Sequence, residues 1–415
     1  MGATNIGSQG AGEENTPVRG SKPVSAESVF IADGAVVAGA TCASQQGPEW
    51  VSEPTNYDAI LLAGFGGPEG QDDVIPFLRN VTRGRGIPDE RLEEVAHHYR
   101  HFGGVSPINN QNRELKAALE ARLAERGIDL PVLWGNRNWD PYLNDALTEA
   151  KERGFTKLIA IATSAYSSYS SCRQYREDFA DALFDTGLGG EIQIDKVRSF
   201  YNHPGFVQPF LDGVRAAVAE SQEAGFAPEE VELLFATHSI PTDDAVRSGN
   251  RETDFGPHGA YEKQHLEVSE LVANEAAPGY PWKLVYQSRS GPPTQPWLEP
   301  DINDVIEDIG ETRKAIIVVP IGFVSDHMEV MWDLDEEAKE SAEEQNLWFR
   351  RVATPGSDPA YVEGLIDLVL ERVNGTPVEQ RPALTKLGVD YDVCRPGCCE
   401  NPRLGFRPAL AGIAP

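Results

Sequence analysis

A series of acidic residues follows an apolar run in the last quarter of the chain. The segment PIGFVSDHMEVMWDLDEE, residues 320–337, contains Asp326 and then Glu329, Asp333 and Glu337 at intervals of four. On a helix this interval aligns the last three carboxylates, and like charges so spaced destabilise the helix mildly. Carboxylate oxygens bind hard and borderline divalent cations, so the row could guide a metal ion. The alternative is a solvated helix face, the commoner origin of such a pattern.

A histidine follows another apolar run. The segment ELLFATHSIP predicts a strand that ends at His238, before a turn that contains proline. A neutral imidazole near pH 7 can accept a proton or bind a metal ion. The alternative is a structural histidine held by hydrogen bonds.

Apolar runs and helical patterns alternate from Tyr57 onward. NRELKAALEARLAERG places Leu115, Leu119 and Leu123 on one helical stripe. Strands separated by helices predict an α/β fold, whose parallel sheets are flanked by helices and bind ligands at the carboxyl ends of the strands. A chain of 415 residues exceeds the usual size of a single core, so we expect two lobes. The predicted strands lie in AILLAGFGG, PVLWGNRNW, KLIAIATSAY, ELLFATHS, KLVYQSRSG and AIIVVPIGF.

The sequence divides into five predicted parts. Residues 1–55 are rich in small and polar residues and predict a disordered extension. The first lobe is predicted over 56–188 and the second, with His238 and the carboxylates, over 189–350. A helix within 351–380 is predicted to cross back to the first lobe, and a tail with cysteines follows over 381–415.

Composition excludes several classes of function. The chain of 415 residues has 65 acidic and 36 basic residues, and a net charge of −29 repels nucleic acid and anionic membrane surfaces. No apolar stretch approaches the roughly 20 residues of a spanning helix, and no secretory signal is visible at the N-terminus. Five cysteines make no disulfide framework in a chain of this length. We therefore expect a cytoplasmic protein.

Six motifs together resemble one enzyme family. GFGGPE, GGVSPI, THSIP, YQSRSGP, PWLEPD and PIGFVSDHMEVMWDLD occur in the order and at about the spacing found in ferrochelatases, over about residues 57–375. SSYSSCRQYRED and the cysteine-bearing tail resemble the actinobacterial branch. The resemblance implies two similar Rossmann-like lobes with a porphyrin cleft between them. It also implies insertion of ferrous iron, with coproporphyrin III as the substrate and haem as the end product of the pathway.

The resemblance also assigns roles to residues. It implies that His238 accepts pyrrole protons or binds iron, that Glu329 holds iron or relays protons, and that Asp333 and Glu337 continue the path outward. Some bacterial relatives have a tyrosine that can meet the iron where this chain has Phe65, which excludes that ligation. The implied porphyrin contacts are Phe65, Arg83, Arg85, Ser106 and Tyr175.

The cysteines form a second candidate site. Clustered thiols in a reducing compartment indicate a metal more than cross-links. Relatives with such a tail bind a [2Fe–2S] cluster through four thiolates, which here implies Cys172, Cys394, Cys398 and Cys399. Structural zinc is the alternative. Adjacent side chains usually point apart, so one of the tail pair could be a bystander, and Cys42 is a poor substitute.

Other functions remain open at this stage. A protoporphyrin IX ferrochelatase, a cobalt or nickel tetrapyrrole chelatase and a tetrapyrrole carrier without activity would each use the same cleft. The expected partners are a porphyrin and ferrous iron, with no nucleic acid. We expect a monomer that makes transient contacts with enzymes of haem synthesis.

Overall fold

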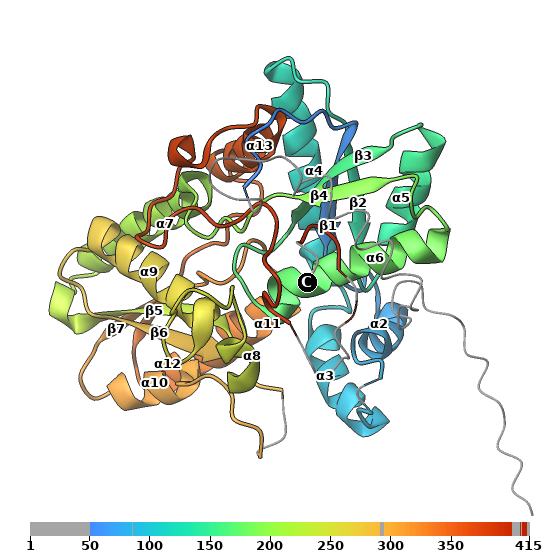
Figure 1. Ribbon diagram of the computed structural model, residues 1–415. Coiled ribbons are helices and arrows are strands. Elements are labelled where there is room, and N and C mark those ends of the chain that lie inside the picture. The colour runs from blue at the N-terminus through green and yellow to red at the C-terminus, as the bar shows by residue number, and fades with distance from the viewer. Residues whose placement is uncertain (1–49, 85, 291–293, 401–406, 408, 413–415) are drawn as a thin grey trace, which may run out of the picture.

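The computed structural model describes residues 50–84, 86–290, 294–400, 407 and 409–412, which form two lobes (Figure 1). Each lobe contains one four-stranded parallel sheet, with strand orders β2-β1-β3-β4 and β6-β5-β7-β8. The predicted α/β fold with two similar lobes is confirmed. The strands are β1 (Ala59–Gly64), β2 (Val132–Asn136), β3 (Lys157–Ala162), β4 (Gln193–Lys196), β5 (Val231–His238), β6 (Trp282–Gln287), β7 (Ala315–Val319) and β8 (Trp348–Arg351).

The strands form where the sequence is apolar on both faces. β1 and β7 are buried at every position, as parallel strands covered on both sides should be. Six strands coincide with the predicted runs, whereas the edge strands β4, QIDK, and β8, WFRR, are too short and polar to show that pattern. Because β4 pairs with β3, the first sheet extends to Lys196, and the boundary placed near residue 188 is too early.

Helices cover both sheets. The α-helices are α2 (Val74–Val81), α3 (Asp89–His101), α4 (Ile108–Glu125), α5 (Leu143–Glu152), α6 (Gln174–Thr186), α7 (Pro204–Glu223), α8 (Thr242–Val246), α9 (Gly259–Ala276), α10 (Ile302–Ile309), α11 (Met328–Val330), α12 (Ala338–Glu344) and α13 (Pro359–Val373). The π-helical segments are η2 (Tyr169–Arg173) and η4 (Met331–Glu337), and short 3₁₀ turns are η1 (Gln71–Asp73), η3 (Pro228–Glu230) and η5 (Val378–Gln380).

One apolar core runs through both lobes. It contains side chains of α4, α7, α9 and α13 together with inward residues of both sheets. The α4 stripe of Leu115, Leu119 and Leu123 lies in it, as its spacing predicts. α5 and α6 cover the other face of the first sheet, and α10 and α12 cover the other face of the second. The lobes are therefore packed against each other along α7 and α13.

Buried ion pairs fasten α13 to the first lobe. Arg198, just after β4, donates two hydrogen bonds to Glu371 at 2.8 and 3.0 Å, and its side chain is fully buried. Arg372 bonds Asp195 of β4 at 3.1 Å. On the outer side of α13, Arg122 of α4 bonds Glu363 at 2.6 Å in an exposed position. These pairs hold the last helix against the first lobe.

Residues 50–55 are packed, although they lie in the segment predicted to be disordered. Val51 is fully buried, and its amide donates to the Asp392 carboxylate at 2.8 Å. The buried Arg381 guanidinium bonds both the Asp392 carboxylate, at 2.7 Å, and the Val51 carbonyl, at 2.8 Å. Hydrogen bonds to Arg381 and Asp392 of the tail therefore hold the chain in place at Val51. The rest of the predicted extension, including Cys42, lies outside the described residues.

A search of the described helices for a membrane span finds none with the necessary length and apolar character.

The Arg198–Glu371 pair should contribute strongly to stability. Arg198→Met would leave Glu371 buried with only a 4.0 Å contact to Arg381, so we expect a loss of about 3–5 kcal/mol in the free energy of unfolding. The matched control Arg122→Met removes an exposed pair and should cost about 1 kcal/mol or less. Urea unfolding followed by circular dichroism measures the free energy of unfolding of both variants. Equal losses in the two variants would contradict the view that the buried pair fastens α13 to the first lobe.

Candidate active site

Two adjacent strands end at the candidate site. β5 ends at His238, and its neighbour β7 leads through a loop into α11 and η4. The loop lies close to β5, because the Gly322 amide donates to the Ala236 carbonyl at 3.2 Å. A Cβ at position 322 would lie 2.1 Å from the Thr237 hydroxyl oxygen, so only glycine fits. The close approach places the start of the acidic row beside His238.

His238 and Glu329 form the centre of the site. Nε2 of His238 lies 3.5 Å from Oε2 of Glu329, and the two side chains are 31% and 50% exposed. Nδ1 of His238 pairs with the Ser239 carbonyl, which fixes the ring and leaves Nε2 directed at the carboxylate. The His238 carbonyl in turn accepts from the Tyr261 hydroxyl at 2.9 Å. The site therefore holds one oriented imidazole nitrogen against one open carboxylate.

The pair changes the pKa of both members. Burial favours the neutral imidazole, but the Glu329 carboxylate outweighs it and raises the pKa of His238 to about 9. Burial likewise favours the neutral carboxyl, but His238 lowers the pKa of Glu329 to about 2. At neutral pH both groups are therefore charged. The raised His238 pKa contributes to stability fully below pH 6.5, and that contribution is lost as the pH rises through about 9.

The next carboxylate lies on a π-helix. Because η4 is π-helical, the acids lie on a wider turn than the α-helix predicted from their spacing. Asp333 accepts from Gln287 Nε2 at 3.2 Å and from the Ser288 hydroxyl, both at the end of β6. Burial raises the pKa of Asp333 to about 7. The hydrogen bond from Ser288 lowers this pKa, whereas the negative charges of Glu329 and Glu337 raise it. Asp333 can therefore change protonation near neutral pH.

The sequence alone did not predict that Gln287 and Ser288 belong to the site. Gln287 Nε2 also donates to the Glu329 carbonyl at 3.1 Å, so it joins two steps of the acidic row. Ser288 has a φ of 62°, an uncommon left-handed backbone for serine that turns its hydroxyl toward Asp333. The one feature of the sequence that could have indicated them is their position at the end of the strand in YQSRSGP.

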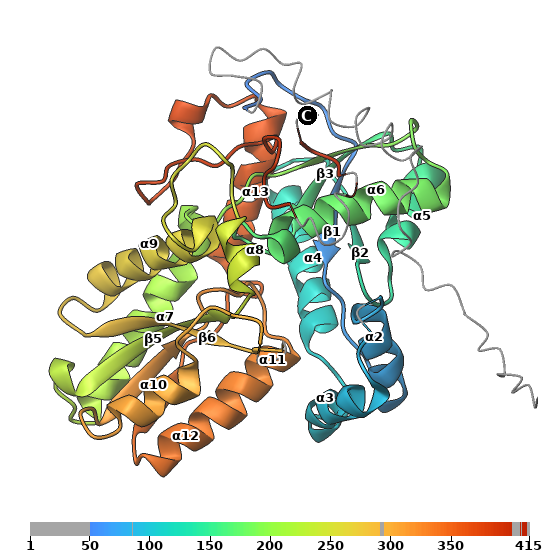
Figure 2. The ribbon, with the colours of Figure 1, turned by 60° about the horizontal axis from the view of Figure 1, so that its bottom comes forward.

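The outer end of the row faces helix α3 of the first lobe. The Glu337 carboxylate accepts from the Trp332 indole at 2.7 Å. The Trp332 ring stacks on His98 of α3 at 4.1 Å with an interplanar angle of 7°. Figures 1 and 2 show α11, which begins the row, at the junction of the lobes beside α2 and α3. The carboxylates thus run along an inter-lobe contact.

Asp326 has a structural role. Its carboxylate is 3.1 Å from Arg351 at the end of β8 and accepts from the Thr354 hydroxyl at 2.9 Å. Its amide donates to Gln111 of α4 at 2.9 Å, which links the lobes. Asp326 is therefore a member of a salt-bridge network and lies apart from the row that begins at Glu329.

The first lobe supplies an apolar wall. Phe65, at the end of β1, is partly buried against a cluster that includes Phe77, Tyr99 and Met328. Met328 directly precedes Glu329, so this cluster joins the two lobes beside the site. Burial raises the pKa of Tyr99, and the charges of Glu329 and Asp333 raise it further, which places its hydroxyl near the row. Phe65 is thus close to the His238–Glu329 pair through shared neighbours.

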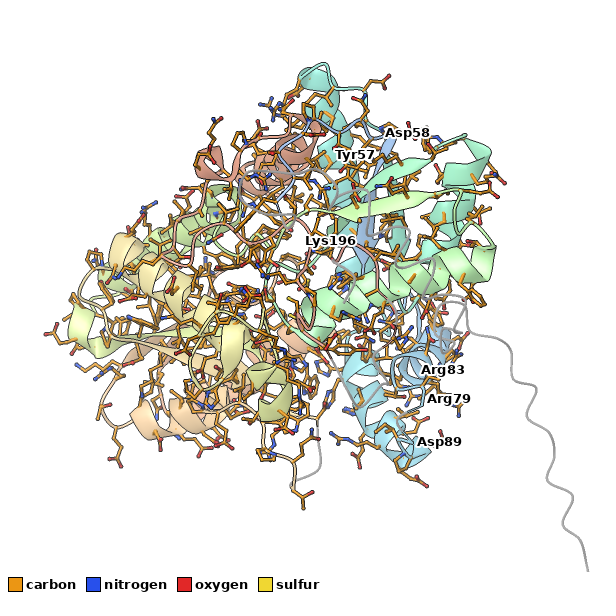
Figure 3. All side chains as sticks on the ribbon, in the orientation of Figure 1. Tyr57, Asp58, Arg79, Arg83, Asp89 and Lys196 are labelled. Atoms are coloured by element: carbon orange, nitrogen blue, oxygen red, sulfur yellow. The ribbon has the colours of Figure 1, made fainter. Side chains whose placement is uncertain are left out.

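The other predicted porphyrin contacts lie in different surroundings. Ser106 and Tyr175 are each only 3% exposed, Ser106 beneath the turn at Gly67 and Tyr175 beneath the Arg137 guanidinium, 4.6 Å from its ring. Arg83 is exposed after α2, in the same region as Arg79 and Asp89 (Figure 3). Arg85 lies outside the described residues. The substrate roles of these residues remain predictions.

The four predicted cysteines lie together. Cys172 belongs to η2, and the sulfur of Cys394 accepts hydrogen bonds from the thiols of Cys172 and Cys398. The sulfurs of Cys398 and Cys399 are 3.8 Å apart, because Cys399 has a left-handed φ of 54° that turns both toward the same side. The adjacency of the pair is therefore no obstacle to shared ligation. No group of three or more His, Cys, Asp or Glu side chains in the described part of the chain is arranged as a metal site, so a cluster remains a prediction.

Comparisons with known proteins agree with the site. The ferrochelatase family pattern matches residues 57–373. A coproporphyrin III ferrochelatase of Leifsonia xyli subsp. xyli is 69% identical and covers 91% of this chain and 100% of its own length. The coproporphyrin III ferrochelatase of Tropheryma whipplei is 52% identical, covering 92% and 97%, and a ferrochelatase of Rhodopirellula baltica is 48% identical, covering 88% and 99%. The chain belongs to the ferrochelatase family, and it is a metal chelatase of haem biosynthesis.

The charged state of His238 can be measured directly. In NMR titrations of metal-free protein with labelled histidine, His238 should titrate near pH 9. Glu329→Gln removes the attraction and leaves burial, which favours the neutral ring, so its pKa should fall well below that value. Glu337→Gln, farther along the row, is the matched control and should leave the titration unchanged. An unaltered His238 pKa in Glu329→Gln would contradict the pairing.

Proposed function

We propose that this chain inserts ferrous iron into coproporphyrin III, with His238 and Glu329 as its catalytic residues. The reaction exchanges one Fe²⁺ for two pyrrole protons, so the site must receive a cation and release protons. The observation that supports the proposal best is the 3.5 Å contact between an oriented imidazole and an open carboxylate at the junction of the lobes. The names of close relatives support coproporphyrin III as the substrate.

The proposed mechanism begins with the charged pair. His238 holds a proton at neutral pH, so it must lose that proton before it can accept one from a pyrrole nitrogen. A ferrous ion that approaches Glu329 neutralises the carboxylate and repels the imidazolium, and both effects lower the pKa of His238. The released proton has an acceptor in Asp333, which titrates near neutral pH. Neutral Nε2 then takes the first pyrrole proton, passes it outward along the acidic row to solvent, and takes the second pyrrole proton in the same way.

The acidic row would serve as the path of iron and protons. Glu329, Asp333 and Glu337 offer carboxylate oxygens at successive steps, which suit a cation that is losing its water ligands. Asp333 is held by Gln287 and Ser288, and Glu337 by Trp332, so each step has a fixed orientation. Such positioning reduces the cost of reorganisation while the ion moves. A carrier without activity would have no need of it.

The porphyrin would lie between the lobes against the wall at Phe65. An apolar surface suits the macrocycle, and a wall that bends the ring would expose the nitrogen lone pairs, which favours the transition state over the flat substrate. Arg83 is the proposed propionate contact, because a guanidinium binds a carboxylate with charge-assisted bonds. Protoporphyrin IX, cobalt and nickel remain the alternative substrates.

Substrate preference tests the assignment. Under anaerobic conditions with ferrous iron, coproporphyrin III should be metallated with a higher kcat/KM than protoporphyrin IX, because it has four propionates instead of two. Arg83→Ala should reduce kcat/KM for coproporphyrin about tenfold or more, the effect of a lost bond of about 1.5–3 kcal/mol. The control is Arg79→Ala, whose arginine is 3.4 Å from Asp89 in the same region. Equal or faster metallation of protoporphyrin would refute the substrate assignment.

We also infer that Cys172, Cys394, Cys398 and Cys399 hold a [2Fe–2S] cluster. Their burial and sulfur contacts support it, and the Gly249 amide, which donates to Cys399 Sγ at 3.1 Å, supplies a bond typical of a thiolate ligand. When bound, such a cluster can take up one electron and tie the tail to both lobes. A four-thiolate zinc site is the alternative.

Iron and sulfide analysis tests the cluster. Purified wild-type protein should be brown and contain about two irons and two sulfides per chain. Cys172→Ser should lose the colour and unfold at lower temperature, because it removes the ligand from the first lobe that anchors the tail. The matched control is Ser170→Ala in the same segment η2, and it should retain the cluster. A colourless wild-type protein with one zinc would favour the alternative.

We also propose a cellular location and an oligomeric state for the protein. Four free cysteines fit a reducing compartment, which supports a cytoplasmic location. The large exposed apolar residues of the described part, among them Val105 and Val246, are scattered along the sequence, which supports a monomer with at most transient contacts to other enzymes of the pathway.

A further inference from the structure

A buried arginine beside the cysteines has an unused donor. Arg176 of α6 is 3% exposed, and its Nε donates to the Leu410 carbonyl of the tail at 2.6 Å. Its Nη1 has no hydrogen-bond partner in the described residues. A Cβ at position 412 would lie 1.9 Å from Nη2, so Gly412 leaves room for the guanidinium. An unsatisfied buried charged donor is costly, and it points to an acceptor that the protein chain does not supply.

The missing acceptor should be anionic and near the thiols. All four cysteines raise the pKa of Arg176 against the opposing effect of burial, so the guanidinium lies within electrostatic range of each of them. The cysteine sulfurs alone leave Nη1 unbonded, although each of them acts on the guanidinium electrostatically. A group that binds the four sulfurs and carries further sulfur or negative charge would satisfy it.

A second buried cation acts on the same thiols. Lys196, the last residue of β4, is 6% exposed, and its Nζ donates to the Val197 carbonyl at 2.7 Å. Lys196 lowers the pKa of both Cys172 and Cys394. Burial and the charge of Cys394 raise the pKa of Asp390, so this partly buried acid is the opposing charge near the thiols, and the two cations outnumber it.

We propose that Arg176 and Lys196 raise the reduction potential of a [2Fe–2S] cluster held by the four cysteines, with Nη1 of Arg176 donating to a cluster sulfur. The inference rests on the proposed cluster. An oxidised cluster with four thiolates is doubly negative, and one electron from a one-electron donor converts one ferric ion to ferrous and makes it triply negative, with no bond broken. Nearby buried cations stabilise the more negative state, so they favour reduction.

Redox titration of the holoprotein tests this role. With dithionite as the reductant and absorbance and EPR as readouts, Arg176→Gln should shift the reduction equilibrium at least tenfold toward the oxidised state, about 59 mV for one electron. Lys196→Gln should shift it in the same direction, and Arg176→Lys, which keeps the charge, should shift it less. The matched control is Arg173→Gln, because Arg173 also donates to a tail carbonyl, that of Arg407 at 2.7 Å, but is paired with Glu177.

The outcomes are distinguishable. If Arg176→Gln and Lys196→Gln retain full iron and sulfide with the wild-type potential, the tuning role is wrong while the cluster stands. If Arg176→Gln loses the cluster, Lys196→Gln decides, since among the described residues the Lys196 ammonium donates only to the Val197 carbonyl. If Arg173→Gln shifts the reduction potential as much as Arg176→Gln does, loss of the anchoring of the tail is the cause, and the proposal fails. Wild-type protein without iron and sulfide would overturn the cluster itself and this inference with it.

Discussion

The contact between His238 and Glu329 is the interaction on which the site depends. It joins the end of β5 to the segment after β7, and the glycine at position 322 allows that approach. The second sheet provides the two strand ends, and the first lobe adds the apolar cluster around Met328. The buried pairs of α13 hold the lobes in this relation. The fold can therefore be understood as a frame that fixes one imidazole against one carboxylate.

The electrostatics of the site give the acidic row a direction. Glu329 is held in its charged form beside an imidazolium, whereas Asp333, which is more buried, titrates near neutrality. A cation that moves inward along the row therefore ends at a carboxylate that stays ionised, beside an imidazolium that must lose its proton as the cation arrives. A proton that moves outward meets a group able to accept it. The π-helix assists by holding the outer carboxylate, Glu337, on the Trp332 indole, which rests against the other lobe.

Sequence alone predicts the parts of this structure that depend on apolar patterns. Six of the eight described strands and the α4 stripe follow from their apolar patterns, but the edge strands β4 and β8 have short polar sequences that carry no such pattern. The positions of His238 and Glu329 follow from strand ends, while the gathering of Cys172 with a tail more than two hundred residues away came from family resemblance. Gln287, Ser288 and Arg176 act through long-range contacts that no local spacing records.

The central claim is that His238 accepts the pyrrole protons. Anaerobic single-turnover metallation of coproporphyrin III by His238→Ala, with porphyrin binding measured separately by fluorescence quenching, tests it most directly. The account predicts that binding persists while iron insertion is almost abolished, and that Asp333→Asn, which alters a later step of the proton path, retains part of the rate. Insertion by His238→Ala at close to the wild-type rate would contradict it.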